Sequence, residues 1–281
     1  FIAADWDGNR PYASFWQTLT RTQQLVSQRP PHIVHSHSEF GDVPAVWLRM
    51  ASRSSLIVRT VHNGYHKEWR KRPARRLLLT NCLYPMTFAA EIGVNRGITH
   101  NLNQRWLAKV LQQRAVFIPN AVNLSRFDNL AVDVLEKRRA LHLPTTALVV
   151  GALGRLAEAK GYETLLEAAA LVIREIPNAW FLVVGDGELT HRLKKLAHQL
   201  GISEQVVFSG PRSDVEELLR SMDLFVCSSL WEGLSTAIME AMASELPVVA
   251  TDIPGNREIL RHEINGWLVP PSHPQAMAEM I

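Results

Sequence analysis

The chain has 281 residues, of which 47% are apolar and 20% are charged, and its formal net charge is +3. Its length predicts two domains of ordinary size, and its composition is that of a folded globular protein. No apolar run approaches the roughly 18 residues that a membrane-spanning helix needs. The two cysteines, Cys82 and Cys227, lack the spacing of a metal site. These properties argue against transmembrane, zinc-ribbon and disulfide-stapled classes and predict a reducing, cytoplasmic location.

The small net charge conceals two halves of opposite sign. Residues 1–142 hold 20 Lys and Arg against 9 Asp and Glu, whereas residues 143–281 hold 10 against 18. This asymmetry predicts two units with different partners. The basic first half is expected to favour an anionic surface or ligand.

The first half alternates helix-like and strand-like segments. Helices are expected over residues 12–28, 43–52, 66–80 and 101–112. Strands are expected over residues 32–36, 56–61 and 115–118, with a further apolar run near 87–94. A polar segment over 123–145 is poor in β-branched residues, so we place the boundary between the two domains at 142/143.

The second half repeats more regularly. Strands are expected over residues 147–153, 179–184, 205–208, 223–227, 247–250 and 266–269. Helices are expected near residues 161–175, 188–200, 213–221, 234–244 and 255–262. This alternation predicts an α/β fold with a parallel sheet that is covered by helices on both faces. Ligands of such sheets bind at the carboxyl ends of the strands.

The loop after the first of these strands carries Gly154, Arg155, Lys160 and Gly161. A forked guanidinium and an ammonium, five residues apart between a strand and a helix, are suited to a diphosphate. Two solvated surface cations would give the same pattern. A later loop has Gly185 and Gly187, which allow the backbone to approach a ligand closely, although a tight turn also explains them. No G-x-G-x-x-G run occurs, which counts against an NAD enzyme.

A third loop, Trp231-Glu232-Gly233-Leu234-Ser235, precedes a predicted helix that carries Glu240. The amides of Gly233, Leu234 and Ser235 are expected to form an uncapped helix start, which binds anions. Glu232 is placed to face a sugar ring, and Glu240 to accept hydrogen bonds from a second polyol such as ribose. The spacing alone is not specific, because Glu167 and Glu175 share it on an amphipathic helix.

These segments occur in an order that resembles a known family. The motifs are Ile118-Pro119-Asn120, Gly154-Arg155 with Lys160-Gly161, Val184-Gly185-Asp186-Gly187, Glu232-Gly233-Leu234 with Met239-Glu240-Ala241-Met242-Ala243, Pro247-Val248-Val249-Ala250-Thr251-Asp252 and Asn265-Gly266-Trp267-Leu268-Val269-Pro270-Pro271. Together they resemble the retaining, family-4 type glycosyltransferases of the GT-B fold over most of 115–271. The first half matches through Ile33-Val34-His35-Ser36-His37 and Thr60-Val61-His62.

The resemblance implies two Rossmann-like parallel-sheet domains that face each other across a cleft. Residues 1–142 would be the acceptor-side domain and residues 143–281 the domain that binds a nucleotide-sugar donor. No cofactor and no divalent metal are expected besides this donor, for which the family favours UDP over GDP. The expected acceptor is a hydroxyl of a glycan or of a lipid-linked intermediate.

The resemblance also implies roles for individual residues. Arg155 and Lys160 would bind the diphosphate, and Glu240 would bind the ribose hydroxyls. Glu232 would hold the donor sugar near its reacting carbon, and His62 would reach the donor from the first domain. The loop residues Gly185, Gly233, Leu234 and Ser235 complete the expected donor site.

The chain departs from the family pattern in four places. We expect the opening strand with its glycine-rich loop, and the final helix, to lie outside this sequence. Ala121 stands where the family has Gly in Asn-Gly-Val-Asp, and Glu245 stands where Gly precedes the Pro-Val-Val strand. The donor loops are unaffected by these departures.

Three further features have competing interpretations. His35 and His37 share one face of a strand and are candidate metal ligands, with cleft lining as the alternative. Asp5-Trp6-Asp7 fits the D-x-D of metal-dependent glycosyltransferases, with a solvated loop as the alternative. Residues 66–76 hold six Lys and Arg and one Glu. Solvated charges, a nucleic-acid patch and a basic helix on an anionic membrane compete here, and we favour the membrane interpretation for residues 66–80.

The sequence therefore predicts a retaining, metal-independent glycosyltransferase that is cytoplasmic and peripheral at the inner face of the membrane and does not bind nucleic acid. Two alternatives stay open. One is a nucleotide-sugar epimerase or hydrolase on the same fold, and the other is a non-catalytic fragment that binds the donor. Consumption of donor that requires an acceptor would separate the first interpretation from both.

Overall fold

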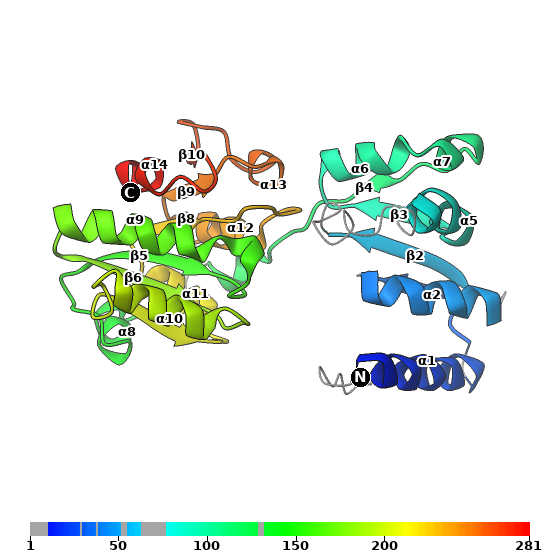
Figure 1. Ribbon diagram of the computed structural model, residues 1–281, viewed down its shortest axis with the longest axis horizontal. Coiled ribbons are helices and arrows are strands. Elements are labelled where there is room, and N and C mark those ends of the chain that lie inside the picture. Colours follow the sequence, from blue (N-terminus) through cyan, green and yellow to red (C-terminus); the bar gives the residue numbers. More distant parts are fainter. Residues whose placement is uncertain (1–10, 29, 38, 52–54, 63–76, 129–131) are drawn as a thin grey trace. The chain divides into compact units, whose positions relative to one another are not determined.

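A computed structural model describes residues 11–28, 30–37, 39–51, 55–62, 77–128 and 132–281 of the chain. The chain divides into two compact units, residues 1–119 and residues 120–281. Figure 1 shows a separate sheet with its own helices in each unit.

Unit 1 contains a four-stranded sheet in the order β1-β2-β3-β4, and all of its strands are parallel. The strands are β1 (Ile33–Ser36), β2 (Leu56–Val61), β3 (Ala90–Gly93) and β4 (Val116–Phe117). The helices are α1 (Pro11–Gln28), α2 (Glu39–Ala51), the π-helix η1 (Leu77–Leu83), α5 (Tyr84–Thr87), α6 (Arg96–Asn103) and α7 (Trp106–Val110). The predicted strands and the first two predicted helices of this half are thereby confirmed.

The helix predicted over 101–112 is instead two short helices, α6 and α7, which meet at Arg105. Arg105 has an extended backbone and a buried guanidinium. This group donates to the carbonyls of Leu102 and Thr80, both at 2.8 Å, and pairs with Glu91 on β3. Burial of the arginine therefore breaks a segment whose local pattern favours one continuous helix.

Four buried charged residues of unit 1, Asp42, Arg59, Glu91 and Arg105, form a network. Arg59 on β2 is 2% exposed and lies 3.3 Å from the carboxylate of Asp42 and 3.2 Å from that of Glu91. The Arg59 guanidinium also lies over the ring of Tyr84, 4.4 Å from its centroid. Because every member has a partner of opposite charge, the network avoids the large cost of an isolated buried ion.

Unit 2 contains a six-stranded, fully parallel sheet in the order β10-β9-β8-β5-β6-β7. The strands are β5 (Leu148–Leu153), β6 (Ala179–Val184), β7 (Val206–Gly210), β8 (Leu224–Cys227), β9 (Val248–Thr251) and β10 (Trp267–Val269). The helices are η2 (Leu124–Arg126), α8 (Val134–Ala140), η3 (Glu158–Lys160), α9 (Tyr162–Glu175), α10 (Thr190–Gln199), α11 (Val215–Arg220), α12 (Thr236–Ala243), α13 (Pro254–Arg257) and α14 (Pro274–Met280). The predicted strands agree with these bounds, whereas α13 is shorter than the helix predicted over 255–262.

This strand order is that of a Rossmann fold, in which the chain reverses direction across the sheet beside its first strand. The reversal lies between β5 and β8, which pair through Val150 with Leu224 and Gly151 with Phe225. The helices that follow β5 and β8 therefore cover opposite faces of the sheet, while the loops that lead into them begin side by side. The crevice between such loops is where ligands of this fold class bind.

Two apolar layers cover the sheet of unit 2. One contains Leu165, Phe181 and Leu193 and joins α9, α10 and α14 to the sheet. The other contains Leu218, Phe225 and Ile238 and joins α11 and α12 to the opposite face. Strands covered on both faces are expected to be apolar at successive positions, which is why their sequence signal is clear.

The described residues of the segment 120–142 pack on unit 2, whereas the sequence predicts the domain boundary after this segment, at 142/143. Phe127 and Leu141 are buried in the core of unit 2. The Arg138 guanidinium donates to the carbonyls of Ser221 and Ala147, both at 3.0 Å, and pairs with Asp223 at 2.9 Å. These long-range contacts, which local composition does not reveal, place the boundary at 119/120.

Two sequence predictions concern residues outside the described ranges. Asp5 and Asp7 lie in 1–10, and most of the basic segment 66–80 lies in 63–76. Among the described helices, none combines the length and the apolar character that a bilayer crossing requires.

The backbone at the end of α12 gives a physical reason for the glycine that the family pattern has at the position of Glu245. The Leu246 amide donates to the carbonyl of Ala241 at 3.0 Å, and the Glu245 amide donates to that of Met242 at 3.0 Å. This is a Schellman motif, which requires a left-handed residue at the position of Glu245. Its φ is +62°, whereas the equivalent residue after α10 is Gly201, with φ +73°. A non-glycine residue costs about 1 kcal/mol in this conformation.

Replacing Glu245 by Gly is expected to raise the free energy of unfolding by about 0.5–1 kcal/mol, after allowance for the greater freedom of Gly in the unfolded chain. Glu245→Ala is the matched control, because it removes the exposed carboxylate and keeps the strained conformation. Urea unfolding of the full chain measures both variants. Equal stabilisation by Ala and Gly would show that the carboxylate, and not the backbone, is unfavourable.

Candidate functional site

The loops after β5 and β8 meet through an ion pair between Lys160 and Glu232. The Lys160 ammonium lies 2.5 Å from Glu232 Oε1, and the two side chains are 23% and 14% exposed. Lys160 ends η3, and Glu232 lies in the loop before α12. The structure therefore brings together two of the predicted site residues, at the place where the strand order reverses.

A series of hydrogen bonds between buried polar groups holds the Glu232 carboxylate in place. Ser229 Oγ donates to Glu232 Oε2 at 2.7 Å, and Thr251 Oγ1 donates to the carbonyl of Ser229 at 2.5 Å. Asn256 Nδ2 donates in turn to the Thr251 carbonyl at 2.9 Å and lies 3.2 Å from Thr251 Oγ1. Because Ser229, Thr251 and Asn256 are buried, this series of hydrogen bonds fixes the position of the carboxylate.

A close backbone approach sets the distance between the two loops. Gly161 has φ +60°, and a Cβ added to it would lie 2.3 Å from the carbonyl oxygen of Ser228. Ser228 Oγ donates to the Lys160 carbonyl at 2.8 Å, and the Leu230 amide donates to the Ala159 carbonyl at 2.8 Å. A glycine is thus required next to Lys160 for both conformational and steric reasons.

The glycine loop after β6 packs on the loop after β5. Gly185 has φ +131°, and a Cβ added to it would lie 2.0 Å from the carbonyl oxygen of Gly154. The buried Tyr162 hydroxyl donates to the same carbonyl at 3.3 Å. Burial, followed by the nearby Cys227 and Glu232, raises the pKa of Tyr162, so this hydroxyl stays protonated. Gly185 therefore supports the Arg155 loop by close contact.

Arg155 lies apart from the pair of Lys160 and Glu232. Its guanidinium contacts the carboxylate of Glu188, with Nη2 at 3.1 Å and Nε at 3.2 Å from Oε2. The Arg155 side chain is 75% exposed and that of Glu188 is 53% exposed. The two predicted diphosphate-binding cations thus have separate carboxylate partners in the free protein.

The expectation of an uncapped helix start is wrong. The helix begins at Thr236, and Ser235 is its N-cap, with Oγ accepting from the Ile238 amide at 3.4 Å. Serine favours this position because its hydroxyl satisfies an otherwise free amide. Gly233 and Leu234 precede the cap and are buried.

Glu240 is half-buried on α12, near an ion pair that sequence patterns do not reveal. Burial raises the pKa of Glu240, while Arg126 opposes this shift and Glu216 adds to it. Arg126 on η2 itself pairs with Glu216. Asn120 contacts the loop that precedes α12, because its Nδ2 donates to the Leu234 carbonyl at 3.2 Å. Asn120 belongs to the motif Ile118-Pro119-Asn120, whereas Arg126 and Glu216 belong to none of the motifs found in the sequence.

Three histidines gather at the carboxyl ends of β1 and β2 in unit 1. His37 Nδ1 lies 3.2 Å from His62 Nε2, and the His35 and His37 ring centroids are 4.1 Å apart. Burial, followed by His37 and then His35, lowers the pKa of His62, which favours its neutral form. Within the described residues, no group of three His, Cys, Asp or Glu has the geometry of a metal site.

Comparison with known proteins identifies the family. The family model described as "Glycosyl transferases group 1" matches residues 133–281. A UDP-Gal:alpha-D-GlcNAc-diphosphoundecaprenol alpha-1,3-galactosyltransferase of Escherichia coli is 30% identical over 90% of this chain and 66% of its own length. An uncharacterized glycosyltransferase of Methanocaldococcus jannaschii is 34% identical over 89% of this chain and 64% of its own length. The chain thus spans slightly less than two thirds of the length of these relatives.

Solved structures show the fold. HepE of Anabaena, in complex with UDP-glucose, superimposes with a TM-score of 0.80 at 23% identity, over 93% of this chain and 70% of that chain. Sucrose-phosphate synthase of Thermosynechococcus elongatus superimposes with a TM-score of 0.78 at 22% identity, over 100% of this chain and 70% of that chain. The chain therefore has the α/β, GT-B fold, with two parallel sheets, that the sequence predicts.

Replacing Gly161 by Ala is expected to destabilise the protein by about 3 kcal/mol, because it combines a left-handed φ with an overlap against the Ser228 carbonyl. Gly201→Ala is the matched control, since its φ is similar and no atom lies within 4 Å of the added Cβ. The control is expected to cost about 1 kcal/mol. Urea unfolding measures both, and equal losses would contradict a steric constraint between the two loops.

Proposed function

The chain belongs to the group 1 glycosyl transferase family, and from this premise we propose that the protein transfers a sugar from a UDP-sugar to a hydroxyl of a glycan or lipid-linked acceptor. The transfer retains the anomeric configuration of the sugar. The observation that carries the proposal is the ion pair between Lys160 and Glu232 at the reversal of the strand order. A cation beside a carboxylate in this crevice suits a ligand with an anionic and a hydroxylated part.

In the proposed donor complex the two members of the pair separate their roles. Lys160 turns from Glu232 to the donor diphosphate, which is a stronger anion. Glu232 then accepts hydrogen bonds from hydroxyl groups of the donor sugar, and Ser229 keeps the carboxylate in place. Arg155 leaves the exposed Glu188 and joins Lys160, which is favourable because a guanidinium binds phosphate oxygens in a bidentate manner.

The remaining groups bind the nucleoside and the sugar. Glu240, half-buried on α12, accepts hydrogen bonds from the ribose hydroxyls. Gly185, Gly233, Leu234 and Ser235 present backbone rather than charged side chains to the donor. His62 is proposed to contact the donor, and its lowered pKa favours a neutral hydrogen-bonding partner.

The reaction exchanges one bond for another at the anomeric carbon. The bond from this carbon to the diphosphate oxygen breaks through an oxocarbenium-like state, and the acceptor oxygen forms a bond on the same face. The acceptor proton passes to the departing phosphate oxygen. Arg155 and Lys160 balance the charge that develops on the diphosphate. We propose on this basis that a divalent cation is not required.

The proposed donor and acceptor classes rest on two similar proteins. HepE was solved with UDP-glucose, and the E. coli galactosyltransferase uses UDP-Gal and an acceptor linked to diphosphoundecaprenol. A lipid-linked acceptor requires access to a membrane surface. The basic segment 66–80 is proposed to supply it by electrostatic attraction to anionic lipids, at a cytoplasmic face.

A thermal-shift panel of UDP-, GDP- and ADP-sugars tests donor binding. The UDP-sugars are expected to stabilise the full chain most, by about 2.7 kcal/mol at 100 times their Kd. Lys160→Ala and Glu240→Ala are expected to lose most of the shift. Lys195→Ala, which removes an exposed lysine from α10, should keep it.

One outcome of this panel, and two outcomes of an assay of donor consumption with and without acceptor, would redirect the proposal. A larger shift with a GDP- or ADP-sugar would show that GDP or ADP, and not UDP, is the nucleotide of the donor. Donor consumption without an acceptor would favour an epimerase or a hydrolase. Binding with no turnover, although acceptors of both classes are supplied, would favour a non-catalytic donor-binding protein.

A second prediction follows from the competition for Lys160. Glu232→Gln is expected to strengthen UDP binding about three- to tenfold, because the lysine no longer leaves a carboxylate when the diphosphate arrives. Glu188→Gln is the corresponding change for Arg155, with a smaller effect because that pair is exposed. Calorimetric titration of UDP measures both. A weaker affinity of Glu232→Gln would indicate that Lys160 does not move to the diphosphate.

A further inference from the structure

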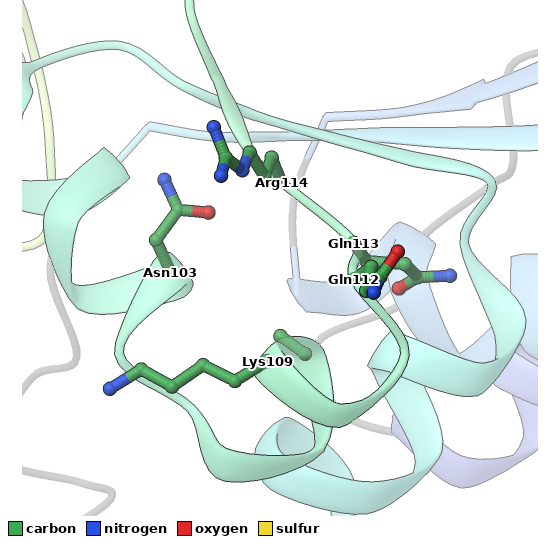
Figure 2. Close-up of a pocket in the computed structure, with 6 residues that line it drawn as sticks. Asn103, Lys109, Gln112, Gln113 and Arg114 are labelled. Atoms are coloured by element: carbon green, nitrogen blue, oxygen red, sulfur yellow. The ribbon is translucent and has the colours of Figure 1, made fainter.

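A cavity of about 680 Å³ lies in unit 1, beside α6, α7 and the segment that leads into β4. Its volume is within the range of roughly 300–1,000 Å³ that small-molecule sites occupy. The residues that line it are Asn103, Ala108, Lys109, Gln112, Gln113 and Arg114. Figure 2 shows Lys109 and Arg114 on opposite sides of this space, with Asn103 toward one end and the two glutamines toward the other.

Five of the six lining residues have polar or charged side chains, and three of these are amides. Asn103, Gln112 and Gln113 each present both a donor and an acceptor, which is the combination that sugar hydroxyls require. Ala108 is the one apolar residue among those that line the cavity, beside the methylene groups of the longer side chains. The lining residues include no aromatic side chain on which a nucleobase could stack, and their amides suit the hydroxyl groups of a polyol.

Several of these groups have hydrogen-bonding capacity to spare. The side chains of Gln112 and Arg114 make no hydrogen bond or ion pair with any residue that the structure describes. Lys109 donates one hydrogen bond, to Gln104 Oε1 at 2.6 Å, which leaves two further N–H groups. The Asn103 amide is held in place by the Ala115 backbone, through contacts of 2.8 and 3.3 Å.

The charge around the cavity is positive. No carboxylate of a described residue lines it, and residues 92–127 contain neither Asp nor Glu. Glu91 is the nearest acidic residue in the sequence, and it is buried between Arg59 and Arg105. The charges of Lys109 and Arg114 are therefore not neutralised by the lining, and they favour an anion.

The cavity lies at the amino-terminal edge of the sheet of unit 1. Arg114 precedes β4, and Gln113 Nε2 donates to the carbonyl of Phe88, which precedes β3, at 3.4 Å. His35, His37 and His62 lie at the carboxyl ends of β1 and β2 instead. Since all strands of this sheet are parallel, the cavity and the histidines occupy opposite edges.

We propose that this cavity binds an anionic glycan segment, whose hydroxyl groups pair with the amides and whose carboxylate or phosphate lies between Lys109 and Arg114. Such a site would hold a glycan away from the edge where the histidines lie. It is independent of the donor loops in unit 2. Its failure would therefore leave the proposed glycosyl transfer untouched.

Calorimetric titration of the full chain, in the presence of saturating UDP, tests the proposal with four probes. These are trigalacturonate, which has hydroxyls and charge, maltotriose, inorganic phosphate, and vesicles of phosphatidylglycerol. Trigalacturonate is expected to bind at least tenfold more tightly than either maltotriose or phosphate. Arg114→Gln and Lys109→Gln are each expected to weaken it about fivefold or more.

Arg21→Gln is the matched control, because Arg21 is an exposed arginine of unit 1 that does not line the cavity. This variant should bind trigalacturonate as the parent does. An unchanged UDP-induced thermal shift verifies that each variant is folded.

Equal affinity for maltotriose, or an unchanged affinity in Arg114→Gln, would overturn the proposal. Binding of phosphate as tight as that of trigalacturonate would reduce the site to a simple anion site. Vesicle binding that depends on Lys109 and Arg114, without saccharide binding, would replace the glycan by a lipid surface.

Discussion

The contact between Lys160 and Glu232 depends on the order of the strands in unit 2. Because β5 lies beside β8, the loops that leave their carboxyl ends emerge next to each other, although Lys160 and Glu232 are 72 positions apart in the sequence. The polar chain through Ser229, Thr251 and Asn256 then fixes the carboxylate, and the contact between Gly161 and Ser228 fixes the lysine loop. Every role that we propose for the donor loops presupposes this arrangement.

Much of the fold follows from the sequence, because parallel strands that are covered on both faces are apolar at successive positions. This signal located the six strands of unit 2 and the loops where ligands of this fold bind. Long-range contacts had no such signal. The break at Arg105 depends on burial of its guanidinium against Glu91, and the boundary at 119/120 depends on Arg138 reaching Ser221. Local patterns record neither partner.

The same distinction between local patterns and long-range contacts applies to the candidate site. The residue types that suit a diphosphate and a sugar were evident from the loops after β5 and β8. The choice of partner was not, since Lys160 contacts Glu232 whereas Arg155 contacts the exposed Glu188. Long side chains select among neighbours by distance and burial, which spacing along the chain does not specify. The capping role of Ser235 was also missed, although serine before a helix is a frequent N-cap signal.

The close approach at Gly161 has a consequence for sequence variation in this region. Two hydrogen bonds to main-chain carbonyls join the Lys160 loop to the loop after β8. The Leu230 amide donates to the Ala159 carbonyl, and the Ser228 hydroxyl donates to the Lys160 carbonyl. Side chains at 157–159 take no part in these bonds. Substitution of Ala157 or Ala159 is therefore expected to leave these contacts between the two loops in place.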